Sequence, residues 1–456
     1  GSTYTLGRWF LGYAGLITSM FDLPWINGAF SLFYISIVVI LLTEMFEIKN
    51  KGMIVLCAAI FVSFPTVVSS FAYMYTADAY LLAFLLATLA VYLTWCVKKW
   101  GTIAGMVCLA FAMGIYQAYA TVAIVLVLLY IIRQFVIEKL DFLEAVRKDL
   151  KYLGMLVGGA VLYAVILKIT LIRYNITLPG YQGIGALGIM SLGQYKAALQ
   201  KTLYHFRLIL GMEHGVEKRV YSILNASVLL LIGLIFIYLL IRNQVYKKKM
   251  SMLASIAAVC LIPVGAYFIN FTSPDVQYYT LMEMAVCLIY LLMIIMLLQL
   301  DWKTWISKIL KGCGIFVLCG LVYYNVINCN IAYFNMNLSY HKSISIAEDV
   351  LQRIEQMDEF QNQHDKVVIM GDYNCATENL QIMMPSIMGI SNDSFLNDSY
   401  HYTIIWNYCF GVQMEQASYD EMMEIVETDE YKNMSVYPLK GCVEYINGII
   451  VVKMQE

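Results

Sequence analysis

The sequence predicts an all-α polytopic membrane bundle of about ten spans, followed by a small extracytoplasmic α/β domain at the C-terminus. Of the 456 residues, 61% are hydrophobic and only 14% are charged, whereas soluble domains carry about 25% charged residues. The apolar residues also form blocks of roughly 17–22 residues, which is the length needed to cross about 30 Å of hydrocarbon. The more polar composition after residue 330 predicts the separate C-terminal domain.

The apolar blocks place ten candidate spans along the chain. They lie at 28–46, 53–72, 79–97, 102–117, 119–137, 153–173, 221–242, 251–270, 279–299 and 309–330. The chain therefore divides into an N-terminal segment (1–27), a transmembrane domain (28–330) with a long loop at 174–220, and a C-terminal domain (331–456).

Lysine and arginine are distributed unevenly among the predicted loops. One set of loops carries them, near residues 49–51, 98–99, 139–151, 247–249 and 303–308, whereas the alternate short loops near 73–78, 117–119 and 271–278 contain none. Because cytoplasmic loops carry the excess of Lys and Arg, the first set is predicted to be cytoplasmic. The alternate loops, the 174–220 loop and the C-terminal domain are then outside, in a multi-pass protein of the plasma membrane.

The first 27 residues are apolar but are interrupted by Gly7, Gly12, Gly15 and Pro24. Such a segment favours an interfacial helix on the outer leaflet rather than a full span. An outside N-terminus without a signal segment is unusual, so we expect a further span to precede the chain as given.

The C-terminal segment has the pattern of a mixed domain. Residues 343–360 have helical periodicity, and 366–371 (KVVIMG) predict a buried strand. Residues 443–454 (VEYINGIIVVKM) predict a hairpin that turns at Asn447-Gly448.

The cysteines give no indication of a metal site, because no CxxC or Cys/His spacing occurs in the polar tail. Seven others lie inside apolar blocks, where cysteine behaves as a small hydrophobe. A disulfide among Cys375, Cys409 and Cys442 stays an open alternative.

The first candidate site residue is Asp78, at the start of the third predicted span. A carboxylate near the interface has a moderate desolvation cost, so it can serve as an acid or base. The alternative is helix capping by Thr76 or Asp78.

In the turn between the next two spans, Tyr116 and Gln117 would lie at the same depth as Asp78, where phenol and amide groups suit sugar hydroxyls. A tight helical hairpin is itself a structural reason for polar residues there.

Two cations lie near the outer end of the sixth predicted span, Lys168 inside it and Arg173 at its boundary. An intramembrane cation is a functional candidate, and lipid phosphate is a natural partner; the alternative is snorkelling toward the headgroups. Asp275 lies in the predicted outer loop near 271–278, which contains no Lys or Arg. Glu283 could pair with Lys168 inside the bundle, as structure or as part of the site.

The long loop contains an amphipathic stretch at 190–220 that ends in a basic turn with Lys218 and Arg219. A cationic segment outside the cell runs against the usual charge distribution, which favours a reason such as phosphate binding. Glu213-His214 could supply an acid or base, and the alternative is a surface pair without a catalytic role.

Several function classes lack support. The chain has no phosphate-binding glycine loop, Walker motif, HExxH or GxSxG sequence, so nucleotide-driven pumping is not indicated. The net charge of −2 gives no indication of a nucleic-acid partner.

Three stretches resemble the bacterial serotype-converting, Gtr-type glucosyltransferase family: GRWF at 7–10, TADAYLLAFLLA at 76–87 and GIYQAY at 114–119. The apolar course and the α/β tail are also similar, so the resemblance covers most of the chain. It implies a GT-C-like fold and transfer of glucose from a polyprenyl-phosphate donor to a surface polysaccharide or its lipid-linked precursor.

The same resemblance assigns roles to particular residues. Asp78 matches the family's acidic position at the third span, and Arg8 and Trp9 match the motif that follows the first outer loop. GT-C enzymes generally carry catalytic acidic residues in that first loop, and this chain begins downstream of it, so a further base is expected there.

The predicted mechanism is inverting transfer. A carboxylate deprotonates or orients the acceptor hydroxyl, while cations such as Lys168, Arg173 or Arg219 stabilise the leaving polyprenyl phosphate. A phosphate leaving group needs no dedicated general acid, and no cofactor or divalent metal is indicated. The predicted partners are therefore the lipid bilayer, the lipid-linked sugar and a glycan acceptor.

Two other readings stay open. A polysaccharide flippase or other transporter should carry charged or Gly/Pro-broken segments near mid-membrane, whereas the polar groups here gather at the outer ends of the spans. A polymerase or ligase of lipid-linked glycans would share the compartment and the leaving group.

Overall fold

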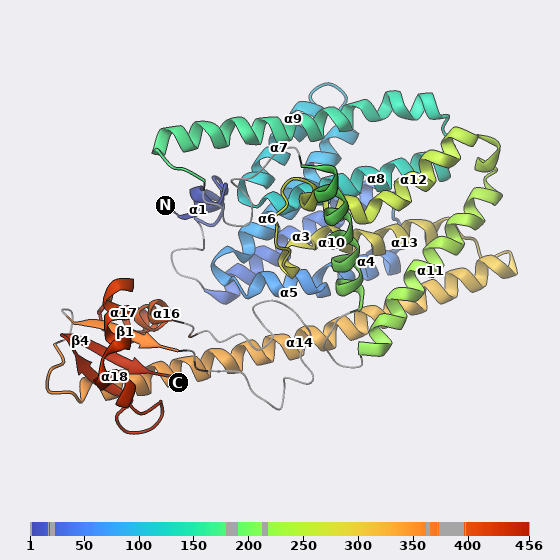
Figure 1. Ribbon diagram of the computed structural model, residues 1–456. Coiled ribbons are helices and arrows are strands. Elements are labelled where there is room, and N and C mark those ends of the chain that lie inside the picture. The colour runs from blue at the N-terminus through green and yellow to red at the C-terminus, as the bar shows by residue number, and fades with distance from the viewer. Residues whose placement is uncertain are drawn as a thin grey trace. The chain divides into compact units, whose positions relative to one another are not determined.

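The computed structural model describes residues 2–16, 18, 23–178, 190–211, 218–361, 365–371, 373, 396 and 398–455. The chain divides into two compact units, one over Gly1–Cys329 and a second formed mainly by residues from Asn330 onwards. The first unit is a helical bundle and the second contains the only sheet among these described residues (Figure 1).

Seven helices within the described ranges are long and apolar enough to cross a membrane. They are α3 (Pro24–Met45), α6 (Met74–Cys96), α8 (Ala120–Val136) with the η1 turn before it (Gln117–Tyr119), α9 (Phe142–Tyr174), α11 (Lys218–Arg242), α12 (Lys249–Ala266) and α14 (Trp305–Glu355). The protein is therefore a multi-pass membrane protein.

The other three predicted blocks are helical but bent or short. α4 (Lys51–Ser63) and α5 (Pro65–Phe71) meet at an angle of 43° and count as an eighth span if taken together. The break falls at Phe64, whose backbone is extended, because a residue before proline is disfavoured in the helical region. α7 (Gly101–Ile115) and the segment Met284–Leu298 are apolar but shorter than a full span. The predicted count of ten spans is thus not confirmed.

The segment before α13 (Leu288–Leu298) differs most from a regular span. It consists of two short turns, η5 (Thr280–Met282) and η6 (Met284–Cys287), with Glu283 between them. A run of apolar residues does not by itself distinguish such turns from a helix.

The N-terminal segment forms two short helices, α1 (Ser2–Thr5) and α2 (Leu11–Ala14), rather than the single interfacial helix that was predicted. Gly7 interrupts the chain between them with φ +71°, a conformation that glycine adopts at low cost. Trp9 and Leu11 are buried against the bundle. Pro24 then starts α3 at a position where its missing N–H is not needed.

Two helices are longer than predicted. α9 has 33 residues and begins eleven residues before the predicted span, at Phe142. α14 has 51 residues, so the predicted last span and the predicted helix at 343–360 belong to one continuous helix that ends at Glu355. In the long loop, α10 (Leu192–Gly211) has the predicted amphipathic pattern, with Ala198 and Thr202 buried and its lysines exposed.

The second unit contains a four-stranded sheet in the order β2-β1-β4-β3. β1 (Lys366–Met370) runs parallel to β2 (Glu415–Gln416) and to β4 (Ile449–Lys453), and β3 (Val443–Ile446) runs antiparallel to β4. The predicted strand at 366–371 and the hairpin at Asn447-Gly448 are confirmed, with both turn residues at positive φ as a type I′ turn requires.

Alternating residues of β1 bury both faces of this sheet. Val367 and Ile369 pack with the end of α14 and with Trp406 beyond α16 (Ser399–Ile405), and Val368 packs with Ile425 of α17 (Tyr419–Glu427) on the opposite face. α18 (Asp429–Asn433) follows α17.

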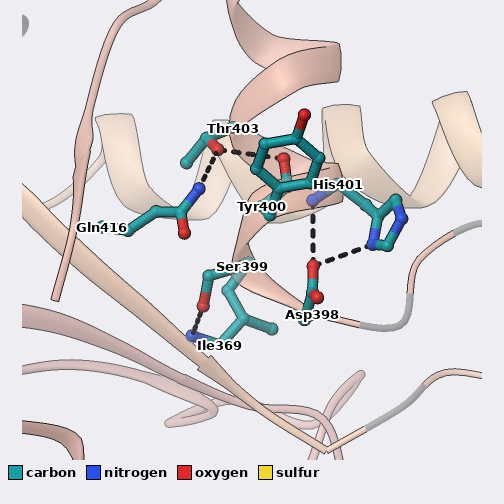
Figure 2. Close-up of polar contacts among 7 residues, drawn as sticks. All are labelled: Ile369, Asp398, Ser399, Tyr400, His401, Thr403 and Gln416. Atoms are coloured by element: carbon teal, nitrogen blue, oxygen red, sulfur yellow. Dashed lines mark hydrogen bonds and ion pairs between the residues drawn. The ribbon is translucent and has the colours of Figure 1, made fainter. Parts of the chain in front are cut away.

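Polar contacts attach α16 to the sheet (Figure 2). The Ile369 amide donates to the Ser399 hydroxyl (2.8 Å), and Gln416 donates to Thr403 (3.1 Å). Asp398 caps the helix by accepting from the His401 amide and also pairs with its ring nitrogen at 2.8 Å. These residues therefore have structural roles.

The two described cysteines of the disulfide alternative are not bonded to each other. Cys409 is exposed and Cys442 is buried, and both are free thiols. Cys375 lies outside the described residues.

Candidate functional site

Asp78 is a buried carboxylate in the second turn of α6, only 2% exposed. Its Oδ2 accepts a hydrogen bond from the Thr18 hydroxyl at 2.7 Å, and its Oδ1 has no partner among the described residues. Tyr73 precedes the helix and no side chain caps it, so the capping alternative does not account for this residue. An unpaired buried carboxylate oxygen is costly, and such groups concentrate where a ligand is bound.

The neighbouring face of α3 is also polar and buried. Asn27 and Ser31 are fully buried, one turn apart, on the helix that packs along α6. Asn27 donates to the Met74 carbonyl at 2.8 Å, but its Oδ1 and the Ser31 hydroxyl have no partner in the part of the chain that is described. Tyr34, almost one turn further, lies within electrostatic range of Asp78. This face of α3 therefore carries hydrogen-bonding groups without partners near the Asp78 carboxylate.

Arg8 joins the N-terminal segment to the same end of α6. Its Nη1 donates to the Tyr80 hydroxyl at 3.2 Å, and its guanidinium lies 4.4 Å from the centre of the Tyr116 ring. Tyr116 in turn stacks on Tyr80 with ring centres 5.1 Å apart. The Nε of Arg8 is buried and has no hydrogen-bond partner within the described residues.

Gln117 and Tyr163 hold the N-terminal segment in place. Gln117 Nε2 donates to the Leu6 carbonyl and to the Tyr163 hydroxyl, both at 2.9 Å, and that hydroxyl donates to the Gly7 carbonyl at 3.1 Å. The contacts observed give Gln117 a positioning role, and its predicted contact with substrate stays a prediction.

Trp9 packs directly on Gly114 of α7. A Cβ atom at Gly114 would lie 2.6 Å from the Trp9 ring, and the Phe10 amide donates to the Gly114 carbonyl at 2.8 Å. The GRWF and GIYQAY stretches, a hundred residues apart in sequence, therefore fit together as one structure.

A second buried acid, Glu283, was predicted only as a partner for Lys168, either as structure or as part of the site. Glu283 is 5% exposed, and its Oε1 accepts from the Tyr267 hydroxyl at 2.8 Å. Tyr267 packs on Tyr278 (4.9 Å between ring centres), which lies within electrostatic range of both Glu283 and Tyr116. The signal in the sequence is an acid at the start of an apolar block, shortly after the paired tyrosines Tyr278 and Tyr279.

The expected pair between Glu283 and Lys168 is wrong. Lys168 lies on the exposed face of α9, while Glu283 is buried and bonded to Tyr267. Helical periodicity explains the difference, because the neighbour Leu167 occupies the buried face and packs with Trp9.

The structure places the remaining predicted residues on its surface. Arg173, Lys218, Arg219 and Asp275 are exposed, and no contact between described residues joins them to the Asp78 group. His214 lies outside the described residues. Of the eleven predicted site residues, Arg8 lies against Tyr116 and binds Tyr80 of α6, and Gln117 holds the segment that carries Arg8 and Trp9, whereas the Asp78 side chain, also on α6, contacts Thr18.

No group of three or more His, Cys, Asp or Glu side chains suited to a metal ion occurs in the described ranges. The hydroxyl of Thr18 bonds to Asp78, and a separate group joins the Arg8 guanidinium to the Tyr80 and Tyr116 phenols. Both sets are hydrogen-bonding groups suited to a polar or anionic ligand.

These observations define a multi-pass membrane protein with a buried carboxylate and an arginine–tyrosine group at one end of its bundle. Residues 1–282 match the family described as Glucosyl transferase GtrII, which is more than half of the chain, so the protein belongs to that family. The match contains every member of the Asp78 and Arg8 groups and ends one residue before Glu283. No curated protein and no solved structure matches the chain.

Family membership indicates that the protein is a glycosyltransferase, and specifically one of the glucosyl transferases. The polar groups collected around Asp78 suit that activity, because transfer requires a group that accepts the proton of an attacking hydroxyl.

Proposed function

We propose that the protein is a GT-C-type glucosyltransferase that moves glucose from a polyprenyl-phosphate donor to a cell-surface polysaccharide or lipid-linked glycan at the outer face of the plasma membrane. The observation that carries this proposal is the unpaired Oδ1 of buried Asp78. It lies within the part of the chain that matches the glucosyl transferase family.

Asp78 is the proposed base. Thr18 occupies Oδ2, so Oδ1 is the atom left to accept the proton of the acceptor hydroxyl. The hydroxyl oxygen then forms a bond to the anomeric carbon, the bond from that carbon to the phosphate oxygen breaks, and the polyprenyl phosphate leaves with the electron pair. A single displacement of this kind inverts the configuration.

Arg8 is the proposed site for the leaving phosphate. Negative charge develops on the departing oxygen, and a fixed guanidinium stabilises it without reorganisation. Tyr80 and Tyr116 hold the guanidinium by a hydrogen bond and a ring face, and its unpaired Nε supports a role in binding the anion. Lys168, Arg173, Lys218 and Arg219 are exposed cations that we propose attract anionic lipid to the surface of the bundle.

The wild-type reaction tests the proposal directly. The full chain is reconstituted into liposomes with polyprenyl-phosphate [14C]glucose, and label is followed into added cell-envelope glycan. We expect label in the glycan. Label that crosses the bilayer while still attached to lipid, with none in the glycan, would contradict the proposal and favour a flippase.

A further inference from the structure

α3 carries two fully buried polar side chains, Asn27 and Ser31, to which the proposed reaction gives no role. They lie one helical turn apart on the same face of the helix. Asn27 Oδ1 and the Ser31 hydroxyl both lack a hydrogen-bond partner among the described residues. Buried polar groups are nearly always paired with protein, water or a ligand, so these two atoms require an explanation.

α3 packs along α6, and the two helices run in the same direction. Near the start of both helices, the Asn27 amide donates to the Met74 carbonyl at 2.8 Å. Near the end of both helices, Tyr92 lies within interaction range of Glu44. Almost equal lengths of helix separate these two contacts, so positions at equal distances from the first contact lie at the same level.

This register places Ser31 at the level of Asp78. Ser31 follows Asn27 by one helical turn, and Asp78 follows Met74 by one turn. Tyr34, almost one turn beyond Ser31, lies within electrostatic range of Asp78, so the carboxylate lies on the side of α6 toward α3. The Ser31 hydroxyl, Asn27 Oδ1 and Asp78 Oδ1 thus form one group of atoms between the two helices that have no partner among the described residues.

These three atoms select a ligand that donates hydrogen bonds. Asp78 Oδ1 and Asn27 Oδ1 are acceptors, and the Ser31 hydroxyl both donates and accepts. A phosphodiester has only acceptor oxygens, so the two acceptors disfavour it here. Neighbouring hydroxyls of a sugar each donate and accept, and they match this set.

We propose that Asn27 and Ser31 bind hydroxyls of the sugar that reacts at Asp78, and that they determine which sugar the site accepts. This inference rests on the proposed glucosyltransferase function. The attacking oxygen must lie within about 3–3.5 Å of the anomeric carbon and within hydrogen-bond distance of its base, so the donor glucose lies close to the level of Ser31. The acceptor sugar brings hydroxyls of the same chemistry to the same level, and the two measurements of the test separate these sources.

The first measurement is binding, which needs no transfer. Native mass spectrometry of the full chain compares polyprenyl-phosphate glucose with its monodeoxy analogues, each of which lacks one sugar hydroxyl. If the two side chains bind the donor, wild type should prefer glucose over at least one analogue by about tenfold, the scale of one hydrogen bond, and Ser31→Ala should lose that preference. Ser36→Ala is the matched control, because it removes an exposed hydroxyl from the same helix, and it should bind as wild type does.

The second measurement is transfer, which identifies a role in binding the acceptor. In that case both variants should keep the donor preference of wild type, and Ser31→Ala should raise the KM for the added cell-envelope glycan by at least about threefold relative to Ser36→Ala. Variants that are indistinguishable in both donor preference and glycan KM would overturn the inference. A wild type that prefers the glucose donor in a manner that depends on Ser31, but transfers no label, would contradict the proposed function and leave this assignment in place.

Thermal unfolding distinguishes a binding role of Ser31 from a structural one. Ser31→Ala removes a buried hydroxyl that has no partner among the described residues, so the ligand-free variant should unfold at no lower temperature than wild type. Asn27→Ala removes the hydrogen bond to Met74 and should unfold at a lower temperature. A marked loss of stability in ligand-free Ser31→Ala would show that its hydroxyl has a structural partner, and would overturn its assignment to the sugar.

Discussion

The arginine at position 8 combines two contacts that a lysine cannot reproduce together. Its planar guanidinium stacks on Tyr116 while one nitrogen donates to Tyr80, and a lysine has only a single ammonium group at the end of a flexible chain. The arrangement therefore fixes the position of the charge rather than merely supplying one.

Arg8→Lys should lower the rate of glucose transfer by at least about tenfold, because a positioned charge at the leaving phosphate stabilises the transition state by several kcal/mol. Initial rates of label transfer measure this. Arg147→Lys, an exposed arginine of α9, is the matched control and should keep the wild-type rate. Equal rates for both variants would remove Arg8 from the mechanism.

Gly7 is a second residue whose chemistry determines local structure. It has φ +71°, and a Cβ there would lie 2.6 Å from Gln117 Nε2 and 2.8 Å from the Tyr163 hydroxyl. Those two side chains anchor the segment that carries Arg8.

Gly7→Ala should therefore destabilise the bundle by about 1–2 kcal/mol from the backbone conformation alone and reduce transfer as Arg8 is displaced. Gly12→Ala is the control, since nothing lies within 4 Å of a Cβ at that position. Thermal unfolding of the two variants in the same detergent measures the difference. A Gly7→Ala protein as stable and active as Gly12→Ala would show that the anchoring contacts do not matter.

At the scale of elements, α17 begins with a capping box in which Ser418 and Glu421 satisfy each other's amides. Glu421 also pairs with Lys366 of β1 at 2.7 Å. This lysine, followed by the Ser418 hydrogen bonds, lowers the pKa of Glu421 to about 2. Because this pKa is depressed in the folded state, the stabilisation is complete above about pH 4.5 and is lost as the pH falls toward 2.

Glu421→Gln should therefore increase hydrogen–deuterium exchange of residues 418–427 at pH 7, and this difference from wild type should shrink below pH 4.5. Comparing the two proteins at each pH removes the intrinsic pH dependence of exchange. A difference that stays constant from pH 7 to pH 3 would show that the carboxylate charge is not involved.

The elements that could be predicted from the sequence are those that one local pattern determines. Apolar blocks located helices at every predicted span, and Asn447-Gly448 located the hairpin. The two turns around Glu283 could not be predicted, because apolar composition is the same in a helix and in a buried turn. The full length of α14 was also not predicted. Its second half is too polar to be recognised as a membrane span, but it continues the same helix.

The candidate site was predictable only in part for a related reason. Asp78 and Arg8 stand out in the sequence as charges near apolar blocks. Whether a helical residue faces the bundle or its surface depends on how the helix is rotated about its axis, and in α9 that rotation buries Leu167 and exposes Lys168. Tyr80 joins the Arg8 group through a tertiary contact alone, and the bond between Glu283 and Tyr267 likewise depends on the folded structure.

For the whole molecule, the distribution of lysine and arginine predicts that the second unit faces outward. Cys409 is an exposed native thiol in that unit and serves as a reporter. A membrane-impermeant maleimide should label it in intact cells, and Cys409→Ser should remove that label.

Lys248→Cys, in a loop predicted to be cytoplasmic, should react only after the membrane is permeabilised. If Cys409 were labelled only after permeabilisation, the second unit would face the cytoplasm. That result would contradict the predicted orientation and the proposal that the reaction occurs at the outer face.

The measurement that bears most directly on the central claim is the rate of glucose transfer by Asp78→Asn in reconstituted full-length protein. The matched control is Asp141→Asn, which changes an exposed aspartate paired with Lys248. We predict that Asp78→Asn transfers glucose at least about a hundredfold more slowly than wild type, the scale of losing a positioned base, while Asp141→Asn is unchanged. An Asp78→Asn protein that is folded and transfers glucose at the wild-type rate would contradict the assignment of Asp78 as the base.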